Sequence, residues 1–524
     1  MTSKIAEPVD PAKKIEAGQP ERSQSAVWIT LAFLALLCLT VWRHEMFRDE
    51  LQPWLIALNA SSIAELFHNL RYEGHPPLWY LLLYVLSRFA DQPGAMQALQ
   101  VMIASASVYI MARYSPFAAW QKVLLAFGYF PLYEYGTFAK YHSLCVLLIF
   151  ISCALFPMRR DRWLAMCGLL FLLANTTAYG WMISLALGIV ILIDRLANCT
   201  YAVRSPAFRW KTVAGACIIV MGLAVSAWQA TPAPGTVALT GWRTGLSISA
   251  TSSMMSTVAG SHFLVPDVLN QWDWILHKPP IINRVQAVAG TLILGFMLCV
   301  FLRRRMVLLL YSIATLAVLG FTYTKFHGKL THHGHLFLIL VACLWLAHHY
   351  GEVRPGGWMG RLSDFGARWG RGFFALVLVV HFVCGLGASA RDWMRPFSNS
   401  KAAARFISRM NGDMPILGDG DLQMTPVCGY LNRSMYYPVR GQFGTFTLWN
   451  RVRHKATEEE LRRGVERMVE SEGEVLVVLN YELDDRRVEE IGVDFLVAFT
   501  GAIVEDENYW LYLARQHKEH RNAD

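Results

Sequence analysis

The sequence predicts a mainly α-helical polytopic membrane protein of about 11–13 transmembrane helices, followed by a small α/β domain outside the membrane. Two observations support this fold class. The chain is 54% hydrophobic, whereas a typical soluble domain is roughly 45–50% apolar even when glycine is counted. Apolar runs close to membrane-spanning length also recur from residue 27 to residue 390, and a more polar composition follows.

The apolar runs predict where the membrane-spanning helices lie. We expect them near residues 27–42, 94–112, 121–134, 138–156, 163–177, 179–195, 211–229, 284–302, 306–322, 335–350 and 373–390. The run 76–90 has about 15 apolar-rich residues, which is short for a span of about 20. We therefore expect it to lie along the outer membrane surface. A full crossing at 76–90 is the alternative, and it would place several arginine-rich loops outside.

The basic loops indicate how the chain is oriented. Lysine and arginine, which give a net charge of +9, fall mainly in short loops between apolar runs, and such loops usually stay in the cytoplasm. This pattern predicts a multi-pass protein of the cell inner (plasma) membrane. Its polar N-terminus (1–26) is then cytoplasmic and precedes a transmembrane domain (27–390). The first outer loop (43–93), the long outer loop (230–283) and the C-terminal domain (391–524) then face the periplasm or the outside.

The C-terminal region has the pattern of a soluble α/β domain. The stretches PILGD, EVLVVLN, DFLVAFTG and YWLYLA are typical of strands, whereas KAAARFISRM and TEEELRRGVERMVES are typical of helices. Strands that alternate with helices favour a small sheet covered by helices.

The basic charge does not indicate a nucleic-acid partner, because no basic-aromatic stripe or nucleic-acid motif accompanies it. An anionic lipid such as a polyprenyl phosphate agrees better with cations near a membrane surface. Most of the ten cysteines lie in apolar segments, and none has the paired spacing of a metal ribbon or a disulfide framework. We expect the cysteines to be packing residues.

Two adjacent carboxylates, Asp49 and Glu50, follow the first apolar segment in the stretch FRDELQPWLIAL. Transfer of a sugar to a hydroxyl requires a carboxylate that accepts the hydroxyl proton or orients the acceptor. At the outer end of a helix, such a group can meet both a lipid-borne donor and an acceptor. The structural alternative is an acidic helix start, in which both residues complement the helix dipole.

Two further outer segments carry polar residues. The stretch RYEGHPPLW contains Glu73 and His75, which could hold an acceptor or contribute to a metal site, although two ligands alone do not make one. The turn PLYEYGTFAKYHS contains Glu134, Lys140 and Tyr141. Charges between two apolar helices are costly unless they are paired or functional. Lys140 therefore either binds a donor phosphate or forms an ion pair with Glu134.

The stretch YTKFHGKLTHHGHLF is the densest cationic feature of the chain. It contains Lys325, His327, Lys329, His332, His333 and His335. Lysine and histidine can stabilise the negative charge of a departing phosphate, whereas a metal site would be expected to include carboxylates or cysteines. A solvated turn at the membrane surface is the alternative. In the long outer loop, Arg243, His262 and Trp272 are weaker candidates.

Four motifs together resemble a known family. RDELQPW after the first helix, GHPPLWYLLL, YEYGTFAKYHSL and HHGHLFLILVACLW resemble the GT-C superfamily of integral membrane glycosyltransferases, near the bacterial protein O-mannosyltransferases and the aminoarabinose lipid A transferase. The resemblance covers residues 27–350. It implies inverting transfer of a hexose or pentose from a polyprenyl-phosphate donor to an outward-facing glycan, lipid or protein.

The resemblance also implies roles for individual residues. Asp49 takes the position of the family's catalytic base or acceptor-positioning acid, with Glu50 as its neighbour. We assign acceptor or metal contacts to Glu73, His75 and Glu134, and a divalent cation stays open as a cofactor. Donor-phosphate binding is assigned to Lys140, Tyr141, Lys325, Lys329, His332 and His333. Relatives often have arginine where this chain has Lys140 and Thr331, and lysine cannot make the bidentate contact of arginine.

Two other classes of function remain open at this point. One is a transporter or flippase of lipid-linked sugars, and the other is a non-catalytic envelope assembly protein. Transporters usually bury ionisable groups near the middle of the membrane, whereas the charges of this chain gather at one face. The leading prediction is therefore a membrane glycosyltransferase whose partners are a polyprenyl-phosphate sugar, an extracytoplasmic acceptor and membrane lipids.

Overall fold

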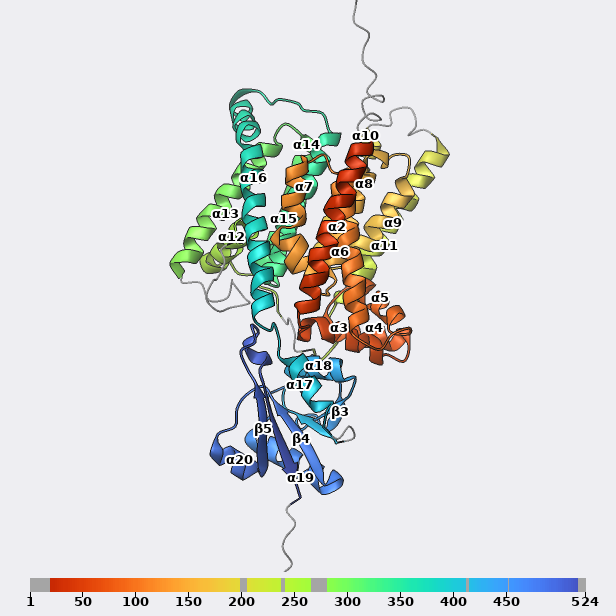
Figure 1. Cartoon of the computed structure of the whole chain (residues 1–524). Coiled ribbons are helices and arrows are strands. Elements are labelled where there is room, and N and C mark those ends of the chain that lie inside the picture. The colour runs from red at the N-terminus through yellow and green to blue at the C-terminus, as the bar shows by residue number, and fades with distance from the viewer. Residues whose placement is uncertain are drawn as a thin grey trace, which may run out of the picture.

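The protein is a bundle of helices with a small sheet domain at one end (Figure 1). The computed structural model describes residues 19–197, 205–236, 241–264, 280–410, 414–450 and 452–516. Eight of the described helices are long and apolar enough to cross a membrane. They are α2 (Gln19–Arg43), α6 (Gly94–Tyr114), α10 (Ala178–Ala197), α11 (Pro206–Ala230), α13 (Pro280–Phe301), α14 (Arg305–Thr324), α15 (Leu330–Leu346, continued by the 3-10 turn η4, Ala347–His349) and α16 (Gly357–Met394).

The other three spans expected from the sequence form shorter elements. They are α7 (Ala119–Ala126) with the π-helix η1 (Tyr129–Thr137), α8 (His142–Leu155) with the 3-10 turn η2 (Phe156–Met158), and α9 (Trp163–Ala174). The run 121–134 breaks at Gly128, where α16 crosses closely. A Cβ atom on Gly385 of α16 would lie 2.7 Å from the Phe127 carbonyl oxygen. At this close contact the chain forms two elements, α7 and η1, and not one continuous helix.

The first outer loop folds into three short helices at one end of the bundle: α3 (Arg48–Asn59), α4 (Ile63–Glu73) and α5 (Leu78–Leu86). Helix α5 has 9 residues and rises only about 14 Å at 1.5 Å per residue, against a hydrocarbon core of about 30 Å. The helix is too short to cross by itself, and the position of 76–90 along a membrane surface stays a prediction. A further helix, α12 (Ile248–His262), lies in the described part of the long outer loop.

The C-terminal region contains a six-stranded sheet of order β3-β2-β1-β4-β6-β5. Its strands are β1 (Ile416–Gly418), β2 (Met435–Tyr437), β3 (Gln442–Gly444), β4 (Glu474–Leu479), β5 (Val493–Phe499) and β6 (Tyr509–Arg515), and its helices are α17 (Ser400–Ile407), α18 (Asp421–Leu431), α19 (Glu458–Glu472), α20 (Asp485–Ile491) and the 3-10 turn η5 (Glu505–Glu507). Strand β1 pairs in parallel with β2 and β4, and β6 is antiparallel to β4 and β5. The expected α/β architecture is confirmed, although the short strands β2 and β3 were not predicted.

The sheet domain is bound directly to the first outer loop (Figure 1). The Met46 N–H donates to the Tyr430 hydroxyl over 2.8 Å. The Arg48 guanidinium lies 2.6 Å from the Asp506 carboxylate, and the Arg48 N–H donates to Glu507 over 3.1 Å. Because these contacts lie beside the start of α3, the C-terminal domain has a defined position relative to that helix.

Candidate functional site

A cavity of about 530 Å³ lies between the first outer loop, the ends of several bundle helices and the C-terminal domain. Seven of the residues predicted from the sequence line it together: Asp49, Glu73, His75, Lys140, Tyr141, Lys329 and His332. The remaining lining residues include Arg48, Gln52, Tyr80, His142, Tyr179, Phe321, Phe326, Leu422 and Trp449. The cavity therefore collects polar side chains that are far apart in the sequence.

Asp49 is the second residue of α3, and its carboxylate faces the cavity with 41% of its side-chain surface exposed. The ammonium group of Lys140 lies 2.9 Å away. Enclosure alone would raise the pKa of Asp49, but Lys140, Lys329 and Arg48 outweigh this effect and hold the pKa well below its usual range. Asp49 is consequently an ionised carboxylate beside cations.

Glu50 points away from the cavity and is fully buried. Its carboxylate accepts hydrogen bonds from the Ala139 N–H over 2.7 Å and from the Phe47 N–H over 3.3 Å. It also binds His44 Nε2 at 2.9 Å. The role that the structure supports for Glu50 is therefore to hold the start of α3 against the segment that carries Lys140, and not to contact a substrate.

His44 connects Glu50 to helix α16. Its Nδ1 lies 2.7 Å from the Asp392 carboxylate, and all three side chains are buried. Burial alone would lower the pKa of His44, but the carboxylates of Asp392 and Glu50 outweigh it and raise the pKa to about 10. A charged imidazolium thus joins the end of α2, the start of α3 and the end of α16.

A cationic side of the cavity is formed by Lys140 and Lys329. Lys140 is buried, and its ammonium lies 4.5 Å from the centre of the Phe47 ring in addition to its contact with Asp49. His332, in the first turn of α15, also lines the cavity and accepts a hydrogen bond at Nδ1 from the Lys329 N–H over 3.0 Å. These groups can stabilise an anion that enters the cavity.

The cavity is also lined by Glu73, His75 and Trp449. Burial raises the pKa of Glu73 to about 7, although hydrogen bonds from Gln52 and Trp449 act in the other direction. Burial likewise lowers the pKa of His75 to about 4, so its imidazole is neutral at pH 7. The His75 ring packs on Tyr141 with ring centres 4.9 Å apart.

Other predicted residues do not line the cavity. Glu134 lies within η1 and accepts a hydrogen bond from the Tyr129 hydroxyl over 2.9 Å, whereas Lys140 forms an ion pair with Asp49. His333 Nε2 donates to the His327 carbonyl over 2.6 Å. The ammonium of Lys325 lies 5.1 Å from the Trp242 ring centre. Of the cationic stretch, Lys329 and His332 line the cavity, whereas Lys325 and His333 do not.

The weaker candidates have separate positions. His335 stacks on Tyr179 with ring centres 4.6 Å apart, and His262 is buried with its Nδ1 on the Val258 carbonyl. Arg243 donates its N–H to the Thr324 carbonyl, and Trp272 lies outside the described residues. Among the residues that the structure describes, no three His, Cys, Asp or Glu side chains come together as a metal site.

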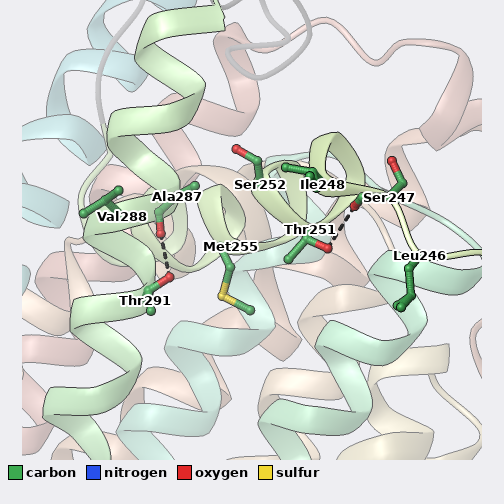
Figure 2. Close-up of a pocket in the computed structure, with 9 residues that line it drawn as sticks. All are labelled: Leu246, Ser247, Ile248, Thr251, Ser252, Met255, Ala287, Val288 and Thr291. Carbon is green, nitrogen blue, oxygen red and sulfur yellow. Dashed lines mark hydrogen bonds between the residues drawn. The ribbon is translucent and has the colours of Figure 1, made fainter.

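A second, apolar hollow of about 500 Å³ lies between α12 and α13 (Figure 2). The hydroxyls of Thr251 and Thr291 donate back to carbonyls of their own helices, which leaves an apolar face. The adjoining segment is attached to α14, since the Ser247 N–H donates to the Tyr323 hydroxyl over 2.8 Å. Phe321, half a turn earlier in α14, lines the charged cavity. The end of α14 thus lies between an apolar hollow and a charged one.

The fold and the cavity define a class of protein: a helical bundle, with eight helices of membrane-spanning character among the described residues, and a polar site beside a small α/β domain. Comparison with known proteins adds no family to this description, because the chain matches no protein-family model and no curated protein is significantly similar to it.

Proposed function

We propose that the protein is a membrane glycosyltransferase that moves a hexose or pentose from a polyprenyl-phosphate donor to an extracytoplasmic glycan, lipid or protein acceptor. The observation that carries this proposal is the ionised Asp49 in one cavity with Lys140 and Lys329. A carboxylate can accept the proton of the acceptor hydroxyl, and the cations can stabilise the negative charge of the donor phosphate. The motifs that resemble GT-C enzymes support the same reaction.

In the proposed reaction, the acceptor hydroxyl attacks the anomeric carbon from the face opposite the phosphate. The new glycosidic C–O bond forms as the bond between the anomeric carbon and the phosphate oxygen breaks, which inverts the configuration. Asp49 accepts the hydroxyl proton, and the lipid phosphate leaves with the bonding electrons next to Lys140 and Lys329. An arriving phosphate competes with Asp49 for Lys140, and weakening that pair makes the carboxylate a stronger base.

The arrangement of helices supports an outward-facing cavity. Helix α14 ends beside the cavity, where Phe321 lines it, and begins at Arg305. Its 20 residues place the basic stretch 303–305 about 30 Å from the cavity at 1.5 Å per residue. Because short basic loops stay in the cytoplasm, we propose a multi-pass plasma-membrane protein with the cavity and the C-terminal domain outside. The shorter elements α7–η1, α8 and α9 would complete eleven crossings in this arrangement.

The apolar hollow between α12 and α13 supports a lipid-linked donor. A polyprenyl tail requires an apolar surface at membrane depth close to the phosphate site, and the two hollows adjoin the same end of α14. Each CH₂ group of the polyprenyl tail that is buried in this hollow would contribute about 0.8 kcal/mol to binding.

The decisive experiment compares Asp49→Asn with the wild type in nanodiscs. Turnover of a panel of radiolabelled polyprenyl-phosphate hexoses and pentoses is measured, together with binding of undecaprenyl phosphate. We expect loss of turnover by about 100-fold or more, the usual scale for a general base, with phosphate binding retained. Asp91→Asn, an exposed carboxylate of the same outer loop, is the matched control. Full turnover by Asp49→Asn would contradict the assignment.

The acceptor and sugar can be identified in cells. Surface glycans and extracted lipids of a strain that lacks this protein are compared by mass spectrometry with those of the parent. We expect one decoration to be absent and to return with the wild-type protein but not with Asp49→Asn. An unchanged glycan and lipid profile would count against glycosyl transfer.

A further inference from the structure

Three side chains from separate segments meet at one part of the cavity lining. Gln52 lies on α3, Glu73 ends α4, and Trp449 follows β3 in the C-terminal domain. Gln52 Nε2 donates to Glu73 over 2.8 Å and to the Thr447 carbonyl over 2.7 Å. Gln52 Oε1 accepts the Thr447 N–H over 2.9 Å. One amide group therefore fixes both the carboxylate of the outer loop and the backbone that carries Trp449.

The Trp449 ring is held in place from two directions. Its indole N–H lies close enough to Glu73 to lower the pKa of that carboxyl, and the Arg453 guanidinium lies 4.6 Å from its ring centre. Arg453 and Arg440 both bind the buried carboxylate of Asp421, over 2.9 Å and 2.5 Å. The ring is thus supported by an ion-pair network of the C-terminal domain, so little side-chain entropy is lost when it binds a ligand.

The chemistry on this side differs from that around Lys140 and Lys329. An aromatic ring offers an apolar surface, and a carboxyl group offers up to four hydrogen-bonding positions, of which Gln52 and Trp449 use only part. A phosphate is disfavoured beside Glu73 because the two groups repel each other when ionised. A pyranose ring, with an apolar C–H face and hydroxyl groups at its edge, matches both features.

We propose that Trp449, Glu73 and Gln52 form a subsite for a pyranose ring, so that the C-terminal domain takes part in selecting the sugar. Asp49 and Gln52 are three residues apart on α3 and therefore lie on the same face of the helix. A sugar held at Glu73 is thereby placed next to Asp49, with the cations beyond. This subsite deepens the proposed glycosyl transfer and rests on it. The ring belongs either to the donor or to the acceptor.

The test measures two ligands separately on the full-length protein in nanodiscs. Methyl pyranosides of several hexoses and pentoses are followed by saturation-transfer NMR, and undecaprenyl phosphate is followed by direct binding. We expect Trp449→Ala and Glu73→Ala to weaken pyranoside binding about tenfold, equivalent to about 1.4 kcal/mol, while phosphate binding is unchanged. Lys329→Ala should give the reverse pattern. Trp369→Ala, an exposed tryptophan of α16 outside the cavity, should change neither.

The same measurements distinguish the source of the sugar. If a polyprenyl-phosphate sugar displaces the pyranoside but undecaprenyl phosphate does not, the subsite holds the donor sugar; if neither displaces it, the subsite holds the acceptor. Wild-type pyranoside binding by both Trp449→Ala and Glu73→Ala would overturn the subsite. The subsite would equally be overturned if undecaprenyl phosphate, which has no sugar, displaced the pyranoside, or if the wild type bound no pyranoside. Failure of undecaprenyl phosphate to bind the wild type would instead refute the lipid-linked donor.

Discussion

Replacing Glu50 by glutamine removes one of the two carboxylates that bind His44. The imidazole lies between Glu50 at 2.9 Å and Asp392 at 2.7 Å, with no exposed side-chain surface on any of the three. Glu50 also accepts the N–H groups of Phe47 and Ala139. A glutamine side chain has nearly the same shape and can still accept a backbone hydrogen bond, so the substitution mainly removes charge.

The pKa of His44 sets the size and the pH range of the expected effect. A pKa raised from 6.5 to about 10 corresponds to a stabilisation of at most about 5 kcal/mol, at 1.36 kcal/mol per unit. Because the folded-state pKa is raised, this stabilisation is complete below pH 6.5 and is lost as the pH rises towards 10. With one carboxylate neutralised, about half of it should go, which predicts a gap of about 2–3 kcal/mol between variant and wild type.

The assay is thermal unfolding of both proteins in detergent at pH 6, 8 and 10. We expect Glu50→Gln to unfold at a lower temperature at pH 6 and 8, and the difference should shrink by pH 10, where His44 of the wild type is about half deprotonated and the stabilisation by its charge is nearly gone. Asp364→Asn, which removes an exposed carboxylate on the same helix as Asp392, should have little effect. A difference between Glu50→Gln and the wild type that is constant from pH 6 to 10 would refute a charged His44.

Three further substitutions test other parts of the structure. Burial raises the pKa of Glu73 from 4.5 to about 7, so the wild type loses stability as the pH rises through that interval. Glu73→Gln does not titrate there, and its stability relative to the wild type should therefore be higher at pH 8 than at pH 5 by about 1–3 kcal/mol. Unfolding temperatures of both proteins at the two pH values measure this difference. Gly334→Ala should destabilise by about 1–3 kcal/mol because its Cβ would collide with the rings of the π-helix, whereas Gly320→Ala has open space and should not; both are compared by thermal unfolding. Gln52→Leu removes the side chain that pairs with the N–H and the carbonyl of Thr447, and a buried group left unpaired costs about 1–3 kcal/mol. We expect faster amide hydrogen exchange at Thr447 in this variant. Unchanged exchange would show that the contact between the C-terminal domain and α3 does not depend on Gln52.

The sequence predicted those parts of the site that depend on which end of a helix a residue occupies. Hydrophobic length and the charge of the loops placed Asp49, Lys140 and Lys329 at the same end of the bundle, and the structure brings all three to one cavity. Counting crossings assigns helix ends to the same end of the bundle and so limits which residues can meet, but it does not select among them, since Lys325 and Glu134 were assigned to that end and do not line the cavity. The α/β character of the C-terminal domain was also predicted, in this case from local strand and helix patterns.

The direction in which a side chain points could not be predicted in this way. Asp49 and Glu50 are adjacent, and on a helix adjacent residues diverge by about 100°, so only one faces the cavity while the other meets His44. Glu134 is directed away by the π-helix, whose register no periodicity indicated. Trp449 comes from the loop after β3 in the C-terminal domain, and Gln52 of the first outer loop holds the backbone of that loop beside Glu73.

The buried His44 contact also explains why the carboxylate of Asp49, which faces the cavity, can have a fixed position. Asp49 lies in the first turn of α3, and a first turn lacks the full set of helical hydrogen bonds. Here the neighbouring residue Glu50 supplies what the helix lacks, because its carboxylate caps the Phe47 N–H and holds the Ala139 N–H that precedes Lys140. The distance between Asp49 and Lys140 therefore depends on a carboxylate, that of Glu50, which does not line the cavity. A change at His44 or Asp392 should then alter turnover through the separation of Asp49 and Lys140, even though neither residue lines the cavity.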